Sequence, residues 1–313
     1  MSKPYLSIVV PVYNEADNLD ALFTRLTKAL DAFGKSYEII LINDGSRDKT
    51  ESILNDLYQK RPDHLRIVHF NGNFGQHMAI MAGFERARGD IVITLDADLQ
   101  NPPEEIPNLV KAIEAGHDYV GSIRKNRQDT WFRRHASRLN NLIRSKITGI
   151  VMTDQGCMLR AYKKHIIDAV VASKESSVYI PALAYSYASS PTEIEVDHSE
   201  RAAGESKYNL YRLLRLNFDL MTGFSLAPLQ AFTLFGMIVS LLSTLFVIYL
   251  FVRRLIIGPE AEGMFTLFAI MYFLIGVGLM GLGIVGEYVG RIYKEVRQRP
   301  LFIVRETLEK TDD

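Results

Sequence analysis

Apolar, β-branched runs of strand length alternate with amphipathic stretches through the first two thirds of the chain. The strands expected from these runs are Leu6–Val12, Glu38–Ile42, Leu65–Phe70, Asp90–Leu95, Tyr119–Ser122 and Ile194–Val196. The intervening helical patterns fall at Ala16–Phe33, Lys49–Gln59, Gln76–Ala87 and Pro103–Ala115. Strands separated by helix-length segments are typical of βαβ units. The pattern therefore predicts an α/β domain with a mainly parallel sheet over residues 1–205.

Two long uncharged stretches, Leu220–Val252 and Met264–Gly286, follow this domain. Each exceeds the roughly 20 residues that an α-helix needs to cross a bilayer. A buried helical hairpin is the alternative, but uncharged runs of this length are rare in soluble cores. The expected segments are an interfacial helix at 206–225, transmembrane helices at 226–252 and 264–286, an extracytoplasmic loop at 253–263, and a cytoplasmic interfacial helix and tail at 287–313.

Basic residues around these stretches favour a cytoplasmic position for both termini and the α/β domain. The flanks on the domain side carry Arg212, Arg215, Arg291, Lys294, Arg297 and Arg299. The connecting loop carries Arg253 and Arg254, which weakens the bias without reversing it. Gly276, Gly283 and Gly290 recur at heptad spacing in the second stretch. They would allow close approach of the first stretch or of a second copy in a homo-oligomer.

The composition narrows the class of protein. The 313 residues have a formal net charge of zero and are 48% hydrophobic, so no global field favours nucleic-acid binding. Cys157 is the only cysteine, which excludes disulfides within the chain. Met1-Ser2-Lys3-Pro4 leads directly into the first strand pattern, so no signal peptide is expected.

The most informative polar residues follow the fourth expected strand. Asp96 and Asp98 lie two residues apart, so on an extended segment they point to the same side. Ligands of parallel sheets bind at such strand ends. With the amide of Gln100, the two carboxylates suit a divalent cation that keeps most of its coordination sphere for phosphate oxygens. The alternative is that they cap the helix that begins near Pro103.

Two other strand ends carry polar residues at the same expected edge of the sheet. The first strand ends in Pro11–Glu15, where Asn14 could instead be a helix N-cap. The second is followed by Asn43–Ser46, which could instead be a simple turn. Turns alone do not require three polar strand ends to converge, whereas a nucleotide pocket does.

A basic cluster follows the fifth expected strand. Its members are Arg124, Lys125, Arg127, Arg133, Arg134, Arg138, Arg144 and Lys146, with only Asp129 opposing them. A solvated helix face is one interpretation of such a cluster. Because membrane stretches follow, we favour an anion site near a membrane surface.

In chain order, Pro11–Glu15, Asp44-Gly45-Ser46 and Asp96–Glu104 resemble the motifs of family 2 glycosyltransferases with the GT-A fold. Together with the two uncharged stretches, the resemblance narrows to the polyprenyl-phosphate glycosyltransferases and covers nearly the whole chain. One departure is Asn43, where the family often has a first aspartate. An amide there can still hydrogen-bond to a base, but it cannot accept twice as a carboxylate does.

Three further segments resemble the branch of that family that transfers 4-deoxy-4-formamido-L-arabinose. They are Asn73–His77, Asp154–Arg160 and Gly204–Tyr208. Glucosyl relatives share much of this pattern, so glucose is the alternative sugar. Within these segments, His77 and Cys157 are expected to serve packing rather than catalysis.

The resemblance implies roles for individual residues. The residues that would line the uridine pocket are Pro11, Tyr13, Glu15, Asp44 and Asp96. The metal, Mg²⁺ or Mn²⁺, would be held by Asp98 and Asp96, with Gln100 close by. The residues that would hold the acceptor phosphate are Arg124, Arg127, Arg133, Arg134 and Ser137. Arg201 and Lys207 would close a loop over the diphosphate, or form a basic pair at the membrane surface.

The implied activity is an inverting, metal-dependent transfer from a UDP-sugar to undecaprenyl phosphate at the cytoplasmic face of the bacterial inner membrane. Its implied role is in lipid A modification and resistance to cationic peptides. Asp154 matches the position of a proposed base, with a structural turn residue as the alternative. A lipid monophosphate has a second pKa of about 6 and is already a nucleophilic anion. We therefore expect Asp154 to orient the reactants, with Asp96 as the other catalytic candidate.

Three other kinds of protein fit less well. A processive polysaccharide synthase would carry Gln-x-x-Arg-Trp, but the only tryptophan, Trp131, lacks that context. A non-catalytic scaffold would not need the intact carboxylates. A flippase would be expected to carry charge within its membrane spans.

Overall fold

The computed structural model describes residues 3–125, 150, 152–154, 156–173, 179–197, 226–258, 264–297 and 299–310. The chain divides into two compact units. One comprises residues 1–207 together with 299–313, and the other comprises residues 208–298. The candidate site residues that the structure describes all belong to the first unit.

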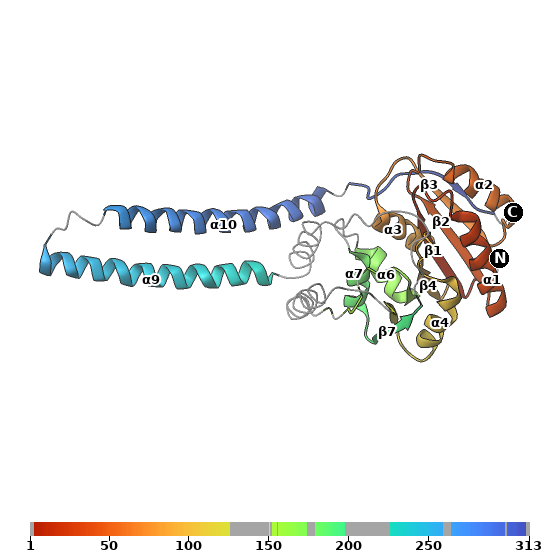
Figure 1. The fold of residues 1–313 in the computed structure, drawn as a ribbon, viewed down its shortest axis with the longest axis horizontal. Coiled ribbons are helices and arrows are strands. Elements are labelled where there is room, and N and C mark those ends of the chain that lie inside the picture. The colour runs from red at the N-terminus through yellow and green to blue at the C-terminus, as the bar shows by residue number, and fades with distance from the viewer. Residues whose placement is uncertain are drawn as a thin grey trace. The chain divides into compact units, whose positions relative to one another are not determined.

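The first unit is built on a sheet with the strand order β7-β5-β6-β4-β1-β2-β3-β8 (Figure 1). The strands are β1 Leu6–Val12, β2 Tyr37–Asn43, β3 Leu65–Phe70, β4 Ile91–Thr94, β5 Tyr119–Arg124, β6 Arg160–Lys163, β7 Pro191–Val196 and β8 Val304–Leu308. The central strands β4, β1, β2 and β3 are parallel to one another, whereas β6 and β8 run antiparallel to their neighbours. The predicted α/β class with a mainly parallel sheet is therefore confirmed.

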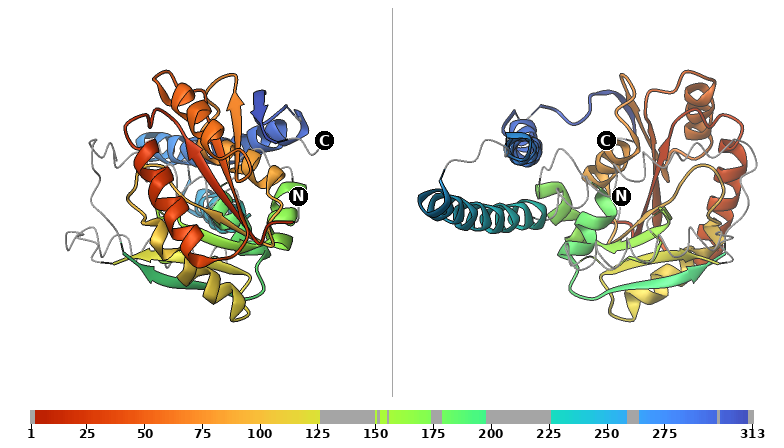
Figure 2. Two further views of the ribbon diagram at one scale, coloured as in Figure 1. Left: turned by 90° about the vertical axis from the view of Figure 1, so that its right-hand side faces the viewer. Right: turned by 60° about the vertical axis from the view of Figure 1, so that its left-hand side comes forward.

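Helices cover both faces of this sheet (Figure 1), and Figure 2 shows the layers from two further sides. The helices are α1 Leu19–Phe33, α2 Thr50–Lys60, α3 Gln76–Arg86, the 3₁₀ turn η1 Pro103–Glu105, α4 Ile106–Glu114, α6 Lys164–Ser173 and α7 Ile180–Tyr187. Alternate residues of β1 share one apolar core with the buried leucines of α1, α2 and α4. On the other face, α3 packs so closely that a Cβ at Gly83 would lie 2.3 Å from Val9 Cγ1. Burial of both faces explains why the central strands are continuous apolar runs.

The sequence pattern did not predict strands β6 and β8. Strand β6 has only four residues, begins with Arg160 and ends with Lys163, so it gives little apolar signal. It lies between β4 and β5. Strand β8, Val304–Leu308, has polar residues at its centre and pairs with β3 at the edge of the sheet. The range 287–313, interpreted as an interfacial helix and tail, therefore contains a strand of the first unit.

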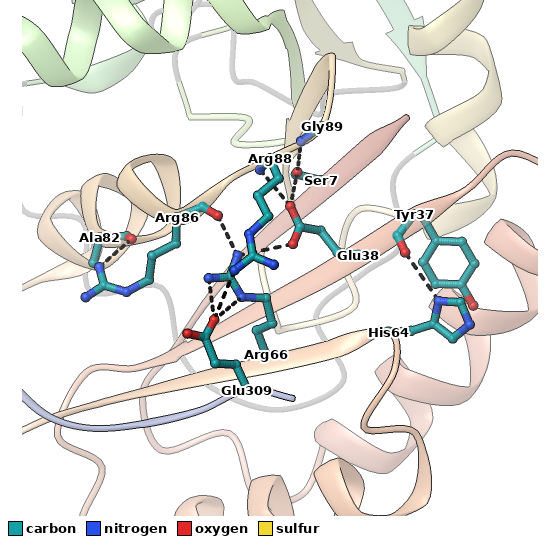
Figure 3. Close-up of polar contacts among 10 residues, drawn as sticks. All are labelled: Ser7, Tyr37, Glu38, His64, Arg66, Ala82, Arg86, Arg88, Gly89 and Glu309. Atoms are coloured by element: carbon teal, nitrogen blue, oxygen red, sulfur yellow. Dashed lines mark hydrogen bonds and ion pairs between the residues drawn. The ribbon is translucent and has the colours of Figure 1, made fainter. Parts of the chain in front are cut away.

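Arg66 links the chain after β8 to the sheet through Glu309, as Figure 3 shows. Its guanidinium donates to Glu38 Oε2 at 3.2 Å and, through Nε and Nη2, to Glu309 Oε2 at 2.9 and 2.7 Å. The Glu38 side chain is only 9% exposed and also accepts from Ser7 Oγ at 2.6 Å. Arg66 therefore neutralises a nearly buried carboxylate and holds the chain after β8 at the same time.

The second unit contains two long apolar helices, α9 Ala227–Ile257 and α10 Met264–Arg297. Within them, Leu229–Ile256 and Ile270–Arg297 are long and apolar enough to cross a membrane, with mean hydropathies of 2.4 and 1.8. The two helices lie side by side as a hairpin (Figure 1). They pack closely at Gly281, where a Cβ would lie 2.2 Å from the Phe232 ring.

The glycines at heptad spacing do not make this contact. A Cβ at Gly276, Gly283 or Gly290 would have no described neighbour within 4 Å, other than its own helix. Among the described residues, Gly281 and not this row packs against the first helix, and packing of the row against a second copy stays a prediction.

Arg66→Met should destabilise the first unit by about 3 kcal/mol, because it leaves the carboxylate of Glu38 buried without its ion-pair partner. In thermal unfolding of the detergent-solubilised protein, this would lower the midpoint by roughly 6–12 °C. Lys310→Met is the control, because the Lys310–Asp63 pair is more than half exposed on both sides. Equal midpoints for the two variants would contradict the role assigned to Arg66.

Candidate functional site

The ends of β1 and β2 are joined by hydrogen bonds at one edge of the sheet. Val12 lies opposite Asn43 in the parallel register. Beyond them, the Asn14 backbone donates to Ser46 Oγ at 3.0 Å, and Asn14 Oδ1 accepts from the Arg47 backbone at 2.8 Å. Asn14 has a φ of 54°, a left-handed conformation that asparagine tolerates. It links two strand ends and does not cap α1, whose N-cap residue is Asn18.

Asp44 ties the end of β2 to the loop before α3. Its two carboxylate oxygens accept from the backbones of Phe74 at 2.7 Å and Gly75 at 2.9 Å. The side chain is buried, and burial raises its pKa although the two N–H groups oppose the shift. Gly45 has a φ of 66°, and a Cβ there would lie 2.4 Å from the carbonyl carbon of Gly72. Asp44 thus shapes the loop that presents α3, and its contact with a nucleotide stays a prediction.

Asp96 and Asp98 lie beyond the end of β4, as the sequence predicts. Gln76, the first residue of α3, donates from Nε2 to Asp96 Oδ1 at 2.7 Å. Burial raises the pKa of Asp96 to about 7, and the charges of Asp98 and Glu15 add to the effect. Asp98 Oδ1 accepts from the Gln100 backbone at 3.1 Å. The first residue of α3 and the segments that follow β1 and β4 therefore lie near one another.

The two carboxylates do not cap the following helix. The N-cap residue of η1 is Pro102, and neither η1 nor α4 has a side-chain cap hydrogen bond. Leu99 has a φ of 59°, so the chain turns sharply between Asp98 and Gln100. The capping alternative is therefore wrong for Asp96 and Asp98.

The donor set fits a cation shared with a substrate. Within the described part of the chain, no group of three or more His, Cys, Asp or Glu side chains is arranged to hold a metal. Two carboxylates with substrate phosphates are, however, the usual protein contribution to Mg²⁺ sites. Burial, and after it the charge of Asp98, raises the pKa of Asp96, and a divalent ion would offset both effects by stabilising the ionised carboxylate. Mg²⁺ or Mn²⁺ on Asp96 and Asp98, with Gln100 nearby, is consistent with these residues.

On the other side of β4, Arg124 and Asp154 form a bidentate ion pair. Arg124 Nε donates to Asp154 Oδ2 at 2.6 Å and Nη2 donates to Oδ1 at 2.9 Å. The Gly156 backbone also donates to Oδ1, at 3.2 Å. The side chain of Asp154 is 3% exposed and that of Arg124 is 24% exposed. A carboxylate already engaged in this way is better suited to hold an arginine than to accept a proton.

The structure describes some of the remaining candidate residues and not others. Pro11 is buried within β1, and Tyr13 is 42% exposed just beyond that strand. Six candidates lie outside the described residues: Arg127, Arg133, Arg134, Ser137, Arg201 and Lys207. The predicted roles of these six stay predictions.

The sequence analysis missed Gln76 and Arg160. Gln76 bonds to Asp96, and its position within the Asn73–His77 segment was the available signal. Arg160 is fully buried, and its Nη2 donates to the Asp154 carbonyl at 2.9 Å. A charged residue inside the apolar run Cys157–Tyr162 was the signal for it.

His77 and Cys157 have packing environments. The ring of His77 meets Tyr179 edge-on at 5.4 Å, and burial lowers the pKa of His77 to about 4. Burial raises the pKa of the Cys157 thiol to about 11, and its Sγ donates to Asn101 Oδ1 at 3.3 Å. Neither group has the environment of a nucleophile or a base near neutral pH.

Residues 7–171 match the sequence model of glycosyl transferase family 2. The chain belongs to this family. Membership agrees with the strand-end carboxylates and with the mixed, mostly parallel sheet, and it confirms the predicted GT-A architecture. The protein is thus a family 2 glycosyltransferase with two apolar helices near its C-terminus.

Curated relatives resemble this glycosyltransferase over nearly its whole length. The undecaprenyl-phosphate 4-deoxy-4-formamido-L-arabinose transferase of Edwardsiella ictaluri is 50% identical over 303 residues, which cover 96% of this chain and 93% of that protein. The transferase of the same name from Aeromonas hydrophila subsp. hydrophila is also 50% identical, with the same coverage.

Solved structures are more distant. Glucosyl-3-phosphoglycerate synthase from Mycobacterium tuberculosis is 15% identical, with a TM-score of 0.48 over 72% of this chain and 79% of that one. A mannosyltransferase from Pyrobaculum calidifontis, solved with GDP-Man and Mn²⁺, is 17% identical, with a TM-score of 0.44 over 90% of this chain and 88% of that one.

His77→Gln should make the glycosyltransferase less sensitive to acid. The pKa of His77 is about 4 in the folded protein against about 6.5 unfolded, so the unfolded chain binds the proton more readily between these values. The contribution of neutral His77 to the free energy of unfolding is fully present above the unfolded pKa of about 6.5. It falls by about 2 kcal/mol by about pH 5. Thermal midpoints at about pH 7 and about pH 5 measure it.

The control for this comparison is His165→Gln, because the side chain of His165 is 64% exposed. It should show the same acid-induced drop as the parent protein. A drop in His77→Gln as large as that of the parent would contradict the buried, neutral state of His77.

Proposed function

We propose that this glycosyltransferase transfers 4-deoxy-4-formamido-L-arabinose from its UDP donor to undecaprenyl phosphate, with inversion at the anomeric carbon. The observation that carries the proposal is the 50% identity, over 96% of the chain, to transferases named for that sugar and that acceptor. The two apolar helices suit an enzyme whose acceptor is a membrane lipid. The reaction would take place at the cytoplasmic face of the bacterial inner membrane and would support lipid A modification and resistance to cationic peptides.

The residues beyond β1, β2 and β4 would bind the donor. Asp96 and Asp98 would hold Mg²⁺ or Mn²⁺, which when bound would neutralise the diphosphate leaving group. Gln76 fixes the orientation of the Asp96 carboxylate through its 2.7 Å hydrogen bond. Tyr13, exposed just beyond β1, is accessible to a nucleotide base. With the base at Tyr13 and the metal at Asp96 and Asp98, the diphosphate of the donor would lie next to these two carboxylates.

The Arg124–Asp154 pair would serve the acceptor. The phosphate of undecaprenyl phosphate, with a second pKa of about 6, is ionised at neutral pH and needs no base to become a nucleophile. It needs a cation that holds it in line with the anomeric carbon. A guanidinium suits phosphate oxygens because it donates in a planar fork. Asp154 would fix the orientation of that guanidinium. Direct attack by the phosphate oxygen on the anomeric carbon would displace the nucleoside diphosphate and invert the configuration.

Asp98→Asn should reduce transfer by about 100-fold, the loss expected when donor phosphates are no longer correctly held. The measurement is transfer of radiolabelled sugar from UDP-sugars into organic-extractable lipid by the purified protein with undecaprenyl phosphate. UDP-4-deoxy-4-formamido-L-arabinose should be the best donor of a panel that includes UDP-glucose. Asp20→Asn, which changes an exposed aspartate of α1, should leave transfer unchanged.

Two results would contradict parts of this proposal. Absence of transfer from every UDP-sugar would refute the activity, and a preference for UDP-glucose would refute the sugar. EDTA should abolish transfer, and added Mg²⁺ or Mn²⁺ should restore it. Full activity in EDTA would exclude the metal role of Asp96 and Asp98.

Asp154→Asn should lower the rate by about 100-fold through misplacement of Arg124. Because no protein base is needed, the rate of the parent enzyme should be flat above about pH 7, where the acceptor phosphate is ionised. Rates measured over a pH series for both proteins test this. If the parent rate instead follows an ionisation in the alkaline part of the series, and that dependence is lost in Asp154→Asn, then Asp154 acts as a base.

A further inference from the structure

Arg160 is a buried cation behind the Arg124–Asp154 pair. It begins β6 and is the largest fully buried side chain in the described part of the protein. Its Nη1 donates to the Tyr119 hydroxyl and lies 3.9 Å from Met152 Sδ, and its Nη2 donates to the Asp154 carbonyl. None of these described partners is a carboxylate. Since burying a guanidinium group is costly even where carboxylates lie nearby, the position of Arg160 calls for an explanation.

The backbone segment that Arg160 holds is the one that carries Asp154. The Thr153 backbone donates to the carboxylate of Glu193 on β7, at 2.9 and 3.1 Å. The Gly156 backbone donates to Asp154 itself. Arg160 adds the contact to the Asp154 carbonyl at 2.9 Å from within the sheet. The backbone of Asp154 is therefore fixed from one side, and its carboxylate holds Arg124 on the other.

Two glycines show how closely these guanidinium groups are packed. A Cβ at Gly156 would lie 3.0 Å from Arg124 Nη2, and a Cβ at Gly121 would lie 3.2 Å from Arg160 Nη1. Both distances are shorter than ordinary van der Waals contact. The positions of both arginines are therefore set by close packing as well as by hydrogen bonds.

We propose that Arg160 is a positioning residue for the lipid phosphate. It fixes the Asp154 backbone, so that the Asp154 carboxylate presents the guanidinium of Arg124 to the acceptor in one orientation. This inference rests on the proposed function, in which the acceptor is a polyprenyl phosphate. Arg160 does not touch the acceptor, so it acts through Asp154 and Arg124.

This relay, the contacts from Arg160 through Asp154 to Arg124, predicts a change in the KM of one substrate only, the lipid phosphate. Lysine at position 160 keeps the charge but cannot reproduce the planar fork that reaches Tyr119 and the Asp154 carbonyl together. Arg160→Lys should therefore raise the KM for undecaprenyl phosphate by about tenfold, the effect of one lost charge-assisted hydrogen bond. The KM for the UDP-sugar should change by less than about twofold, because Asp96 and Asp98 keep their contacts.

A matched control is Arg86→Lys. Arg86 is 24% exposed, and its guanidinium also donates to a backbone carbonyl, that of Ala82 at 3.0 Å. It lies at the end of α3 away from the site, so both KM values should stay as in the parent enzyme. Thermal midpoints of all variants separate loss of folding from loss of acceptor binding.

Gly156→Ala tests the relay without altering Arg160. Its added methyl presses on Arg124 Nη2, so it should also raise the KM for undecaprenyl phosphate and leave the KM for the UDP-sugar unchanged. If Arg160→Lys does not fold, an unchanged acceptor KM in Gly156→Ala still overturns the inference, because the proposed contacts end at Arg124. Equal changes in both KM values, or an unchanged acceptor KM in folded variants, would overturn the inference. A parent enzyme that transfers no sugar would refute the proposed function instead.

Discussion

Strand β6 pairs antiparallel with β4, with Arg160 opposite Thr94 just before the chain reaches Asp96 and Asp98. The Thr94 hydroxyl strengthens this junction by donating to the Met158 carbonyl at 2.6 Å. Because of this ladder, the segment before β6 lies at the same edge of the sheet as the ends of the parallel strands. The β4–β6 junction therefore brings Asp96 and Asp98, which follow β4, to the same edge of the sheet as Asp154, which precedes β6. The rest of the site depends on that junction.

Charge is distributed unevenly across the β4–β6 junction. On the β4 side lie the carboxyl groups of Asp96 and Asp98, and burial together with the Asp98 charge raises the pKa of Asp96. On the β6 side, the guanidinium groups of Arg124 and Arg160 both contact Asp154, the first at its carboxylate and the second at its carbonyl. In the proposed reaction a sugar passes from a nucleoside diphosphate to a lipid phosphate, so two anions come together and positive charge is needed on both sides. A bound cation would supply it on the β4 side, whereas arginine supplies it on the β6 side.

The central strands and the carboxylate pair could be predicted from sequence because their signals are local. Strands buried on both faces are continuous apolar runs, and a spacing of two residues places Asp96 and Asp98 on one side. Strand β6 could not be predicted, because its four residues include charges at both ends. The contact of Arg124 with Asp154 depends on how β5 and β6 pair, which no local pattern specifies. Arg160 was missed because a charged residue is normally assigned to the surface.

The nature of the acceptor decides what kind of aspartate the site requires. A hydroxyl acceptor would need a group that removes its proton, whereas a phosphate with a second pKa of about 6 arrives already charged. Asp154 accepts two guanidinium N–H groups and the Gly156 N–H, and its side chain is 3% exposed. Low exposure strengthens these bonds and limits the freedom of the arginine. An aspartate at the position of a base can therefore contribute by holding a cation still, and the nucleophile then needs only to be placed.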